Sequence, residues 1–224
     1  MKYIIIITLF LGCLNSSFGQ VAIIKDKDGY TNLRADSSSD SKIIHKIKLE
    51  EPFWFDEETY FSTKKDWISV AITKNPFSID CEENYIEGYI HRTRIVPLEN
   101  LKKYTGNEFT FEVKVKEFDS SDKVVDSDDN NFISKINGRF FFGTDGFKPA
   151  IEITEIKIDI NGYKMFVPKV LTEDLFNCSK EHSIYKLEKS YLIYQSCSDG
   201  AGYYDLVWVI NERGVTKRLV GTII

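Results

Sequence analysis

The chain has 224 residues, of which 29 are Lys or Arg and 34 are Asp or Glu, so its formal net charge at pH 7 is -5. A mildly acidic chain is a poor partner for nucleic acid or for an anionic membrane surface, because both usually bind a basic face. The length suits one large or two small domains.

The N-terminus has the pattern of a cleavable secretory signal peptide. Lys2 is followed by an apolar run over residues 4–14 and then by small or polar residues up to Gly19. We predict cleavage after Gly19, so that residues 1–19 form the signal and the mature protein is exported, either periplasmic or secreted. The apolar run is too short to cross a bilayer and no similar run follows, so we expect no transmembrane segment. The alternative is a lipoprotein cut before Cys13, which follows a glycine as in such signals.

The mature chain is predicted to be mainly β. Val, Ile, Tyr, Phe and Thr recur in short alternating runs, whereas no long stretch keeps apolar residues at helical spacing. The best helix candidate is 168–177, because Pro168 can occupy a first turn and the apolar residues after it are spaced for one face. The expected strands are, in chain order, 21–25, 43–47, 67–72, 85–91, 109–118, 139–142, 152–160, 163–167, 191–195 and 206–210.

A boundary is expected near Pro97. This proline ends a strand, and a short polar segment follows before alternation resumes at Phe109. We therefore predict a first domain at 20–98, a linker at 99–106 and a second domain, mostly antiparallel β with one short helix, at 107–224.

The first domain contains four landmarks in a fixed order. They are the sequences YTNLR at 30–34 with a Ser-rich loop behind it, IIHKI at 43–47, DWISV at 66–70 and EGYIH at 87–91. Their order and content resemble the bacterial SH3 domain, a small barrel fused to many exported bacterial proteins. The resemblance spans residues 21–96, and it departs from the family at Ala35-Asp36, at Glu50-Glu51 and in a long insertion over 73–84.

The resemblance implies a small SH3-like barrel that binds an extended chain in an aromatic-lined groove. In exported bacterial proteins such a module often engages cell-wall peptide or acts as a spacer. Aromatic residues at strand spacing also build cores, so a core role is the alternative for each candidate. Gly88 either lets the last strand bend or lets a neighbouring backbone approach. The candidate groove residues are Tyr30, Asn32, Arg34, Trp54, Trp67 and Tyr89.

Two glycine-containing phrases stand out in the second domain, at 142–146 and at 198–204. Each is either a ligand loop or a plain hairpin turn, because Asp-Gly is common turn chemistry. The pair resembles a domain of unknown function in exported proteins of Bacteroidetes-type bacteria, and no activity comes with that resemblance. The candidate residues of the later loop are Asp199, Gly200, Gly202 and Tyr203.

The cysteines permit one disulfide in the second domain. Cys178 and Cys197 could pair in an oxidising compartment and close a loop of about 20 residues, which would leave Cys81 as an odd thiol. The alternative is that all three are unpaired. No metal site or cofactor is predicted, because there is no Cys-x-x-Cys spacing and the acidic stretch 119–131 fails the EF-hand template at Asn131 and Asn137.

No catalytic motif is present, so we expect a protein that is not an enzyme. The three histidines lie in unrelated contexts, and Cys178 with His182 is not a triad, which would be assembled from separate elements. The predicted function is an exported binding or adaptor protein that docks to cell-wall peptide or to a protein partner. The alternative is a periplasmic inhibitor or immunity-type protein that acts through its C-terminal domain. The oligomeric state stays open.

Overall fold

The computed structural model describes residues 21–79 and 85–222. The predicted signal peptide, Cys13 and Cys81 lie outside the described residues. The predicted class is confirmed, because the chain is mainly β and the described residues contain a single short α-helix, α1 (Glu57–Ser62). Asp56 begins this helix by accepting a hydrogen bond from the Thr59 backbone, and Thr63 ends it in a left-handed conformation. None of the described helices has the length and apolar character needed to cross a membrane.

The N-terminal part forms one seven-stranded antiparallel sheet with the order β3-β2-β6-β5-β4-β1-β7. The pairings of the described strands end at β3 and at β7, so they do not by themselves close the sheet into the predicted barrel. Its strands are β1 (Val21–Ile24), β2 (Tyr30–Arg34), β3 (Ile43–Lys48), β4 (Phe53–Phe55), β5 (Trp67–Thr73), β6 (Tyr85–His91) and β7 (Ile95–Pro97).

The C-terminal part contains three smaller antiparallel sheets. A three-stranded sheet has the order β12-β11-β8, with β8 (Phe109–Glu117), β11 (Ile151–Ile160) and β12 (Tyr163–Phe166). A four-stranded sheet follows chain order through β13 (Ser183–Leu187), β14 (Ser190–Cys197), β15 (Tyr204–Asn211) and β16 (Gly214–Gly221). A two-stranded sheet joins β9 (Val125–Ser127) to β10 (Ile133–Ile136).

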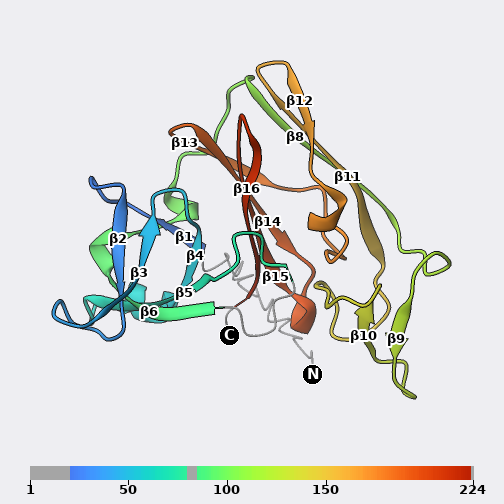
Figure 1. The fold of residues 1–224 in the computed structure, drawn as a ribbon, viewed down its shortest axis with the longest axis horizontal. Helices are drawn as coiled ribbons and strands as arrows, with labels where there is room; N and C mark the ends of the chain where they lie inside the picture. The colour runs from blue at the N-terminus through green and yellow to red at the C-terminus, as the bar shows by residue number, and fades with distance from the viewer. Residues whose placement is uncertain (1–20, 80–84, 223–224) are drawn as a thin grey trace, which may run out of the picture.

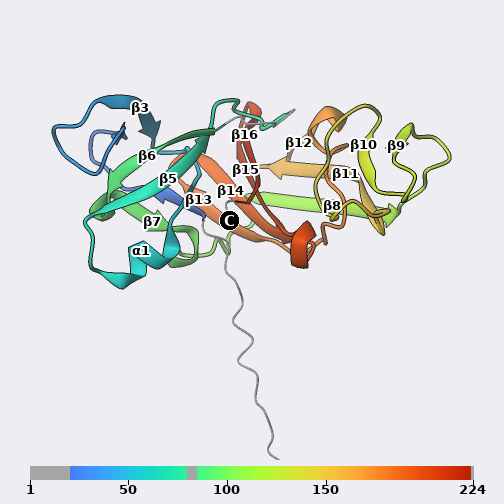
Figure 2. The same cartoon turned by 90° about the horizontal axis from the view of Figure 1, so that it is seen from below.

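The four-stranded sheet is the middle layer of the molecule (Figures 1 and 2). On one face, Leu206, Trp208 and Ile210 pack against the three-stranded sheet. On the other face, Val207 and Val209 pack against the N-terminal sheet. Both faces of β15 are therefore removed from water. This explains why its sequence is a continuous apolar run rather than an alternation of apolar and polar residues.

A disulfide and a buried ion pair hold segments of the C-terminal part together. Cys178 and Cys197 are joined by a disulfide, and both residues are buried. In the chain-entropy model, closing a loop of this size adds about 3 kcal/mol to stability.

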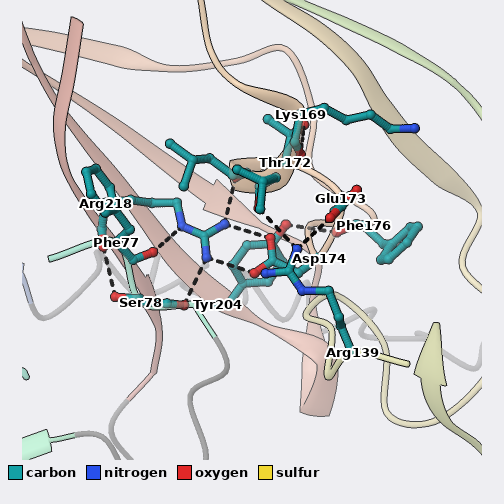
Figure 3. A network of polar contacts seen from close by, with 12 residues as sticks. Phe77, Ser78, Arg139, Lys169, Thr172, Glu173, Asp174, Phe176, Tyr204 and Arg218 are labelled. Carbon is teal, nitrogen blue, oxygen red and sulfur yellow. Dashed lines mark hydrogen bonds and ion pairs between the residues drawn. The ribbon is translucent and has the colours of Figure 1, made fainter. Parts of the chain in front are cut away.

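Arg218 of β16 forms the buried ion pair (Figure 3). Its Nη1 and Nη2 atoms donate to the two carboxylate oxygens of Asp174 at 2.6 and 2.7 Å. Its other N–H groups donate to the carbonyl oxygens of Phe77, Leu171 and Ser78 at 2.6–2.9 Å. All five N–H groups of a fully buried guanidinium are thus satisfied, and the contacts join the segment after β5 to β16 and to the segment before Cys178.

The predicted helix at 168–177 is wrong. Only the short 3-10 helix Lys169–Leu171 forms there. After it, Leu175 forms an isolated β-bridge with Phe142, and Phe176 forms one with Glu152. In a helix, the backbone groups of Leu175 and Phe176 would bond within the helix and could not form these bridges. The predicted strand at 139–142 is also wrong, since that segment makes only isolated bridges, at Arg139 and at Phe142. The strand expected to end at Pro97 is β7, whereas the sequence reading missed β4, β9, β10, β13 and β16.

Candidate functional site

A groove of about 480 Å³ lies on the N-terminal sheet. It contains four of the six candidate groove residues, which come from two separate landmarks of the sequence. It is lined by Asp26, Asp28, Tyr30, Thr31, Asn32, Arg34, Trp67, His91, Thr93 and Arg94.

Strand alternation places three of these side chains in a row on β2. Thr31 and Leu33 are buried, so Tyr30, Asn32 and Arg34 point to the opposite face. Lys46 lies over the Tyr30 ring, with its Nζ 4.3 Å from the ring centroid. The side-chain oxygen of Asn32 is buried, and no described residue donates a hydrogen bond to it.

Trp67 is the aromatic centre of the groove. The Arg34 guanidinium carbon lies 6.0 Å from its ring centroid, and the His91 ring meets it edge-on at 5.6 Å. His91 is fixed in turn by a 2.8 Å hydrogen bond between its Nδ1 and the Thr93 hydroxyl group. An apolar ring flanked by an arginine and a histidine offers both stacking and hydrogen bonding to a bound molecule.

The order β2-β6-β5 explains how these residues meet. β6 lies between the other two strands, and Arg34 stands opposite Tyr89 in this sheet. A Cβ atom added to Gly88 would lie 2.5 Å from the Arg34 carbonyl oxygen and 2.9 Å from Leu33 Cγ. Gly88 therefore serves the close approach of a neighbouring backbone, which is one of the two roles expected for it.

The placement of Trp54 in the groove is wrong. Its side chain is 0% exposed and packs in the cluster between the N-terminal sheet and the four-stranded sheet. Phe53 and Phe55 point into the N-terminal core, so the alternate residue Trp54 points to the outer face of β4. That face is covered by protein rather than by water. Tyr89 is half-buried beside Arg34 and Ser69, but it does not line the groove.

Sequence reasoning missed several groove residues. His91 is the last residue of the final landmark, Thr93 and Arg94 follow that landmark, and Asp26 and Asp28 precede the first one. Arg94 Nη1 pairs with Asp26 Oδ2 at 2.9 Å. The sequence does offer one signal, because His91 ends EGYIH and is followed by Arg92-Thr93-Arg94.

The two glycine phrases of the C-terminal part meet in one cluster. The Ser198 hydroxyl group donates to the Gly143 carbonyl oxygen at 2.8 Å. A Cβ atom on Gly202 would lie 2.9 Å from Thr144 Cα, so the absence of a side chain allows this contact. Gly202 is buried, whereas Asp199 and Gly200 are exposed at the tip of the loop.

A buried carboxyl group lies beside this loop. Asp205 is 2% exposed, and its Oδ1 accepts hydrogen bonds from the hydroxyl groups of Tyr203 at 2.7 Å and Tyr194 at 2.9 Å. Burial raises the pKa of Asp205 above its ordinary value, because loss of water penalises the charged form. Burial and the nearby Asp205 charge also raise the pKa of Tyr203 to about 12. The buried Trp54 Nε1 has no hydrogen-bond partner among the described residues.

The raised pKa of Asp205 predicts how stability depends on pH. Its stabilising contribution is complete below the unfolded value near 3.8 and is lost as the pH rises through the folded pKa. We expect Asp205→Asn to remove this loss, so the variant gains stability relative to the wild type as pH rises, by at most about 1.4 kcal/mol per pH unit. Urea unfolding in steps from pH 4 to pH 8 measures the difference. The exposed Asp199→Asn is the matched control, and equal pH slopes in the two variants would contradict the assignment.

Within the described ranges, no group of three or more His, Cys, Asp or Glu side chains is arranged to hold a metal ion. Comparisons with protein-family models, with curated proteins and with solved structures find no match to this chain.

Proposed function

We propose that this protein is an exported, non-catalytic binding or adaptor protein, and that its N-terminal SH3-like module docks to cell-wall peptide. The observation that carries the proposal is the groove in which Trp67 stands between Arg34 and His91. An extended chain bound across an aromatic-lined groove is an established mode of peptide recognition. The predicted signal peptide supports a location at the cell envelope, where such peptides occur.

Sedimentation with purified cell-wall sacculi tests this proposal. We expect the mature protein, residues 20–224, to sediment with sacculi. We expect Trp67→Ala to weaken the affinity for sacculi about tenfold, because an aromatic contact that is buried on binding is worth about 1–2 kcal/mol or more. Trp67 is only partly buried on the outer face, so the variant should stay folded.

The control is Phe61→Ala, which removes an exposed aromatic side chain outside the groove. Circular dichroism and urea unfolding of each variant show whether it is folded. Loss of binding in the Trp67 variant alone supports the groove. A wild-type protein that does not sediment, or a Trp67 variant that binds as well as the wild type, overturns cell-wall docking through this groove.

The second candidate function is a periplasmic inhibitor or immunity-type protein. It is favoured by the loop at 198–204, where buried Gly202 and the hydrogen-bonded Tyr203 fix an exposed tip at Asp199 and Gly200. A pre-organised exposed tip binds a partner at a lower entropic cost. Absence of wild-type sedimentation, together with stoichiometric capture of a protein that Asp199→Ala abolishes, would favour this function over the first.

A further inference from the structure

Two arginines line the groove, and within the described ranges only one of them has an acidic partner. Arg94 is paired with Asp26, whose side chain is 8% exposed. Among the described residues, no carboxylate lies within 4.0 Å of the Arg34 guanidinium, which pairs only with a backbone carbonyl group. Arg34 is therefore the cation of the groove that is still available to an anion.

The Arg34 guanidinium is also held in place before any ligand binds. Its Nη1 donates to the Ser41 carbonyl oxygen at 2.7 Å, and the guanidinium carbon Cζ lies 6.0 Å from the Trp67 ring centroid. Its Nε and Nη2 atoms have no acceptor in the described part of the chain. A fixed fork of free N–H groups is the geometry that matches a carboxylate with two parallel hydrogen bonds.

The charged groups around Arg34 favour an anion over a cation. Two acidic side chains line the groove, Asp26 and Asp28, and Asp26 forms an ion pair with Arg94. Lys46 stands over Tyr30 on the same face, and His91 flanks Trp67. A lysine- or arginine-rich peptide would meet Arg34 and Lys46 without a free acidic partner for each of its own charges.

We propose that the groove recognises its peptide ligand by a carboxylate, which binds Arg34 while the adjoining part of the peptide packs on Trp67. The inference rests on the proposed function, and it adds the chemical group that is selected. A peptide that carries a free carboxylate binds more tightly than the same peptide with that group converted to a neutral amide.

The experiment compares untreated sacculi with sacculi whose carboxyl groups are capped as methylamides by carbodiimide and methylamine. We expect capping to weaken binding of the wild-type protein about tenfold or more, since a charge-assisted bidentate pair is lost. Arg34→Gln should bind untreated sacculi as weakly as the wild type binds capped sacculi. In that variant, capping should have no further effect, because the partner of the carboxylate has been removed.

Two further variants separate recognition from general charge. Arg34→Lys keeps the charge and loses the fork, so we expect weaker binding than the wild type with part of the capping effect retained. Asp28→Asn changes a charge in the same groove and should keep the full capping effect. A capping effect of equal size in the wild type and in Arg34→Gln overturns the inference, because the carboxylates would then act elsewhere.

A soluble probe keeps the inference testable without sacculi. Acetyl-trialanine as the free acid should shift the indole N–H resonance of Trp67 in the NMR spectrum, and its C-terminal amide should not. If sacculi bind and the capped sacculi bind equally well, the inference fails and the proposed function stands. If sacculi do not bind, the proposed function fails, and the pair of trialanine probes then decides the inference alone: a shift with both probes or with neither overturns it.

Discussion

Arg218→Met is expected to lower the free energy of unfolding by about 3–5 kcal/mol, because it leaves the Asp174 carboxylate buried without its cation. Arg218 is 0% exposed, and its loss also removes the donors to the carbonyl oxygens of Phe77, Leu171 and Ser78. Buried acceptors without a donor cost further stability. Equilibrium unfolding in urea, followed by tryptophan fluorescence, measures the change.

A second substitution shows whether the uncompensated charge is the cause. Asp174→Leu added to Arg218→Met removes that charge, so we expect the double variant to be more stable than Arg218→Met alone. Arg213→Met, in the exposed turn before β16, is the matched control and should change stability by less than about 0.5 kcal/mol. A double variant that is no more stable than the single one would show that the ion pair is not the source of the loss.

Trp54→Ala is expected to destabilise the protein by about 3–5 kcal/mol, because it opens a cavity in a fully buried cluster. The indole packs against Tyr85 edge-on, with ring centroids 5.4 Å apart, and belongs to the cluster that contains Leu192 and Val207 of the middle sheet. The cavity would lie between two sheets rather than inside one of them. Urea unfolding and the rate of limited proteolysis under native conditions report the loss.

Trp67→Ala is the matched comparison for Trp54→Ala. Both changes remove an indole, but Trp67 is partly exposed on the groove side of β5. We therefore expect the Trp67 variant to lose less stability and more binding than the Trp54 variant. If both variants lost stability equally, the assignment of Trp54 to the inter-sheet cluster and Trp67 to the groove would have to be revised.

The contrast between these two tryptophans shows what alternation can predict. A period of two separates the faces of a strand, and on β2 it puts Tyr30, Asn32 and Arg34 on one face. It does not say whether a face meets water or another sheet. Trp54 lies on the outer face of β4, which the four-stranded sheet covers. No local pattern in the sequence predicts that this face is buried.

Long-range polar partners are equally absent from local patterns. Asp174 and Arg218 are 44 residues apart and belong to an irregular segment and to a strand, respectively. The apolar spacing of Leu171 and Leu175 satisfies a helix, but the bridges that Leu175 and Phe176 make with distant residues override this preference.

The middle sheet has consequences for how this chain can be divided. A fragment that ends near residue 98 would turn Val21, Ile23 and Trp54 toward water, because their cover comes from the second half. A fragment that begins near residue 107 would expose Val207 and lose the two carbonyl oxygens before β6 that Arg218 requires. The N-terminal sheet is therefore not an independently folding unit. A gene fusion that carries this sheet into another protein should fold only when the four-stranded sheet is included in the fusion.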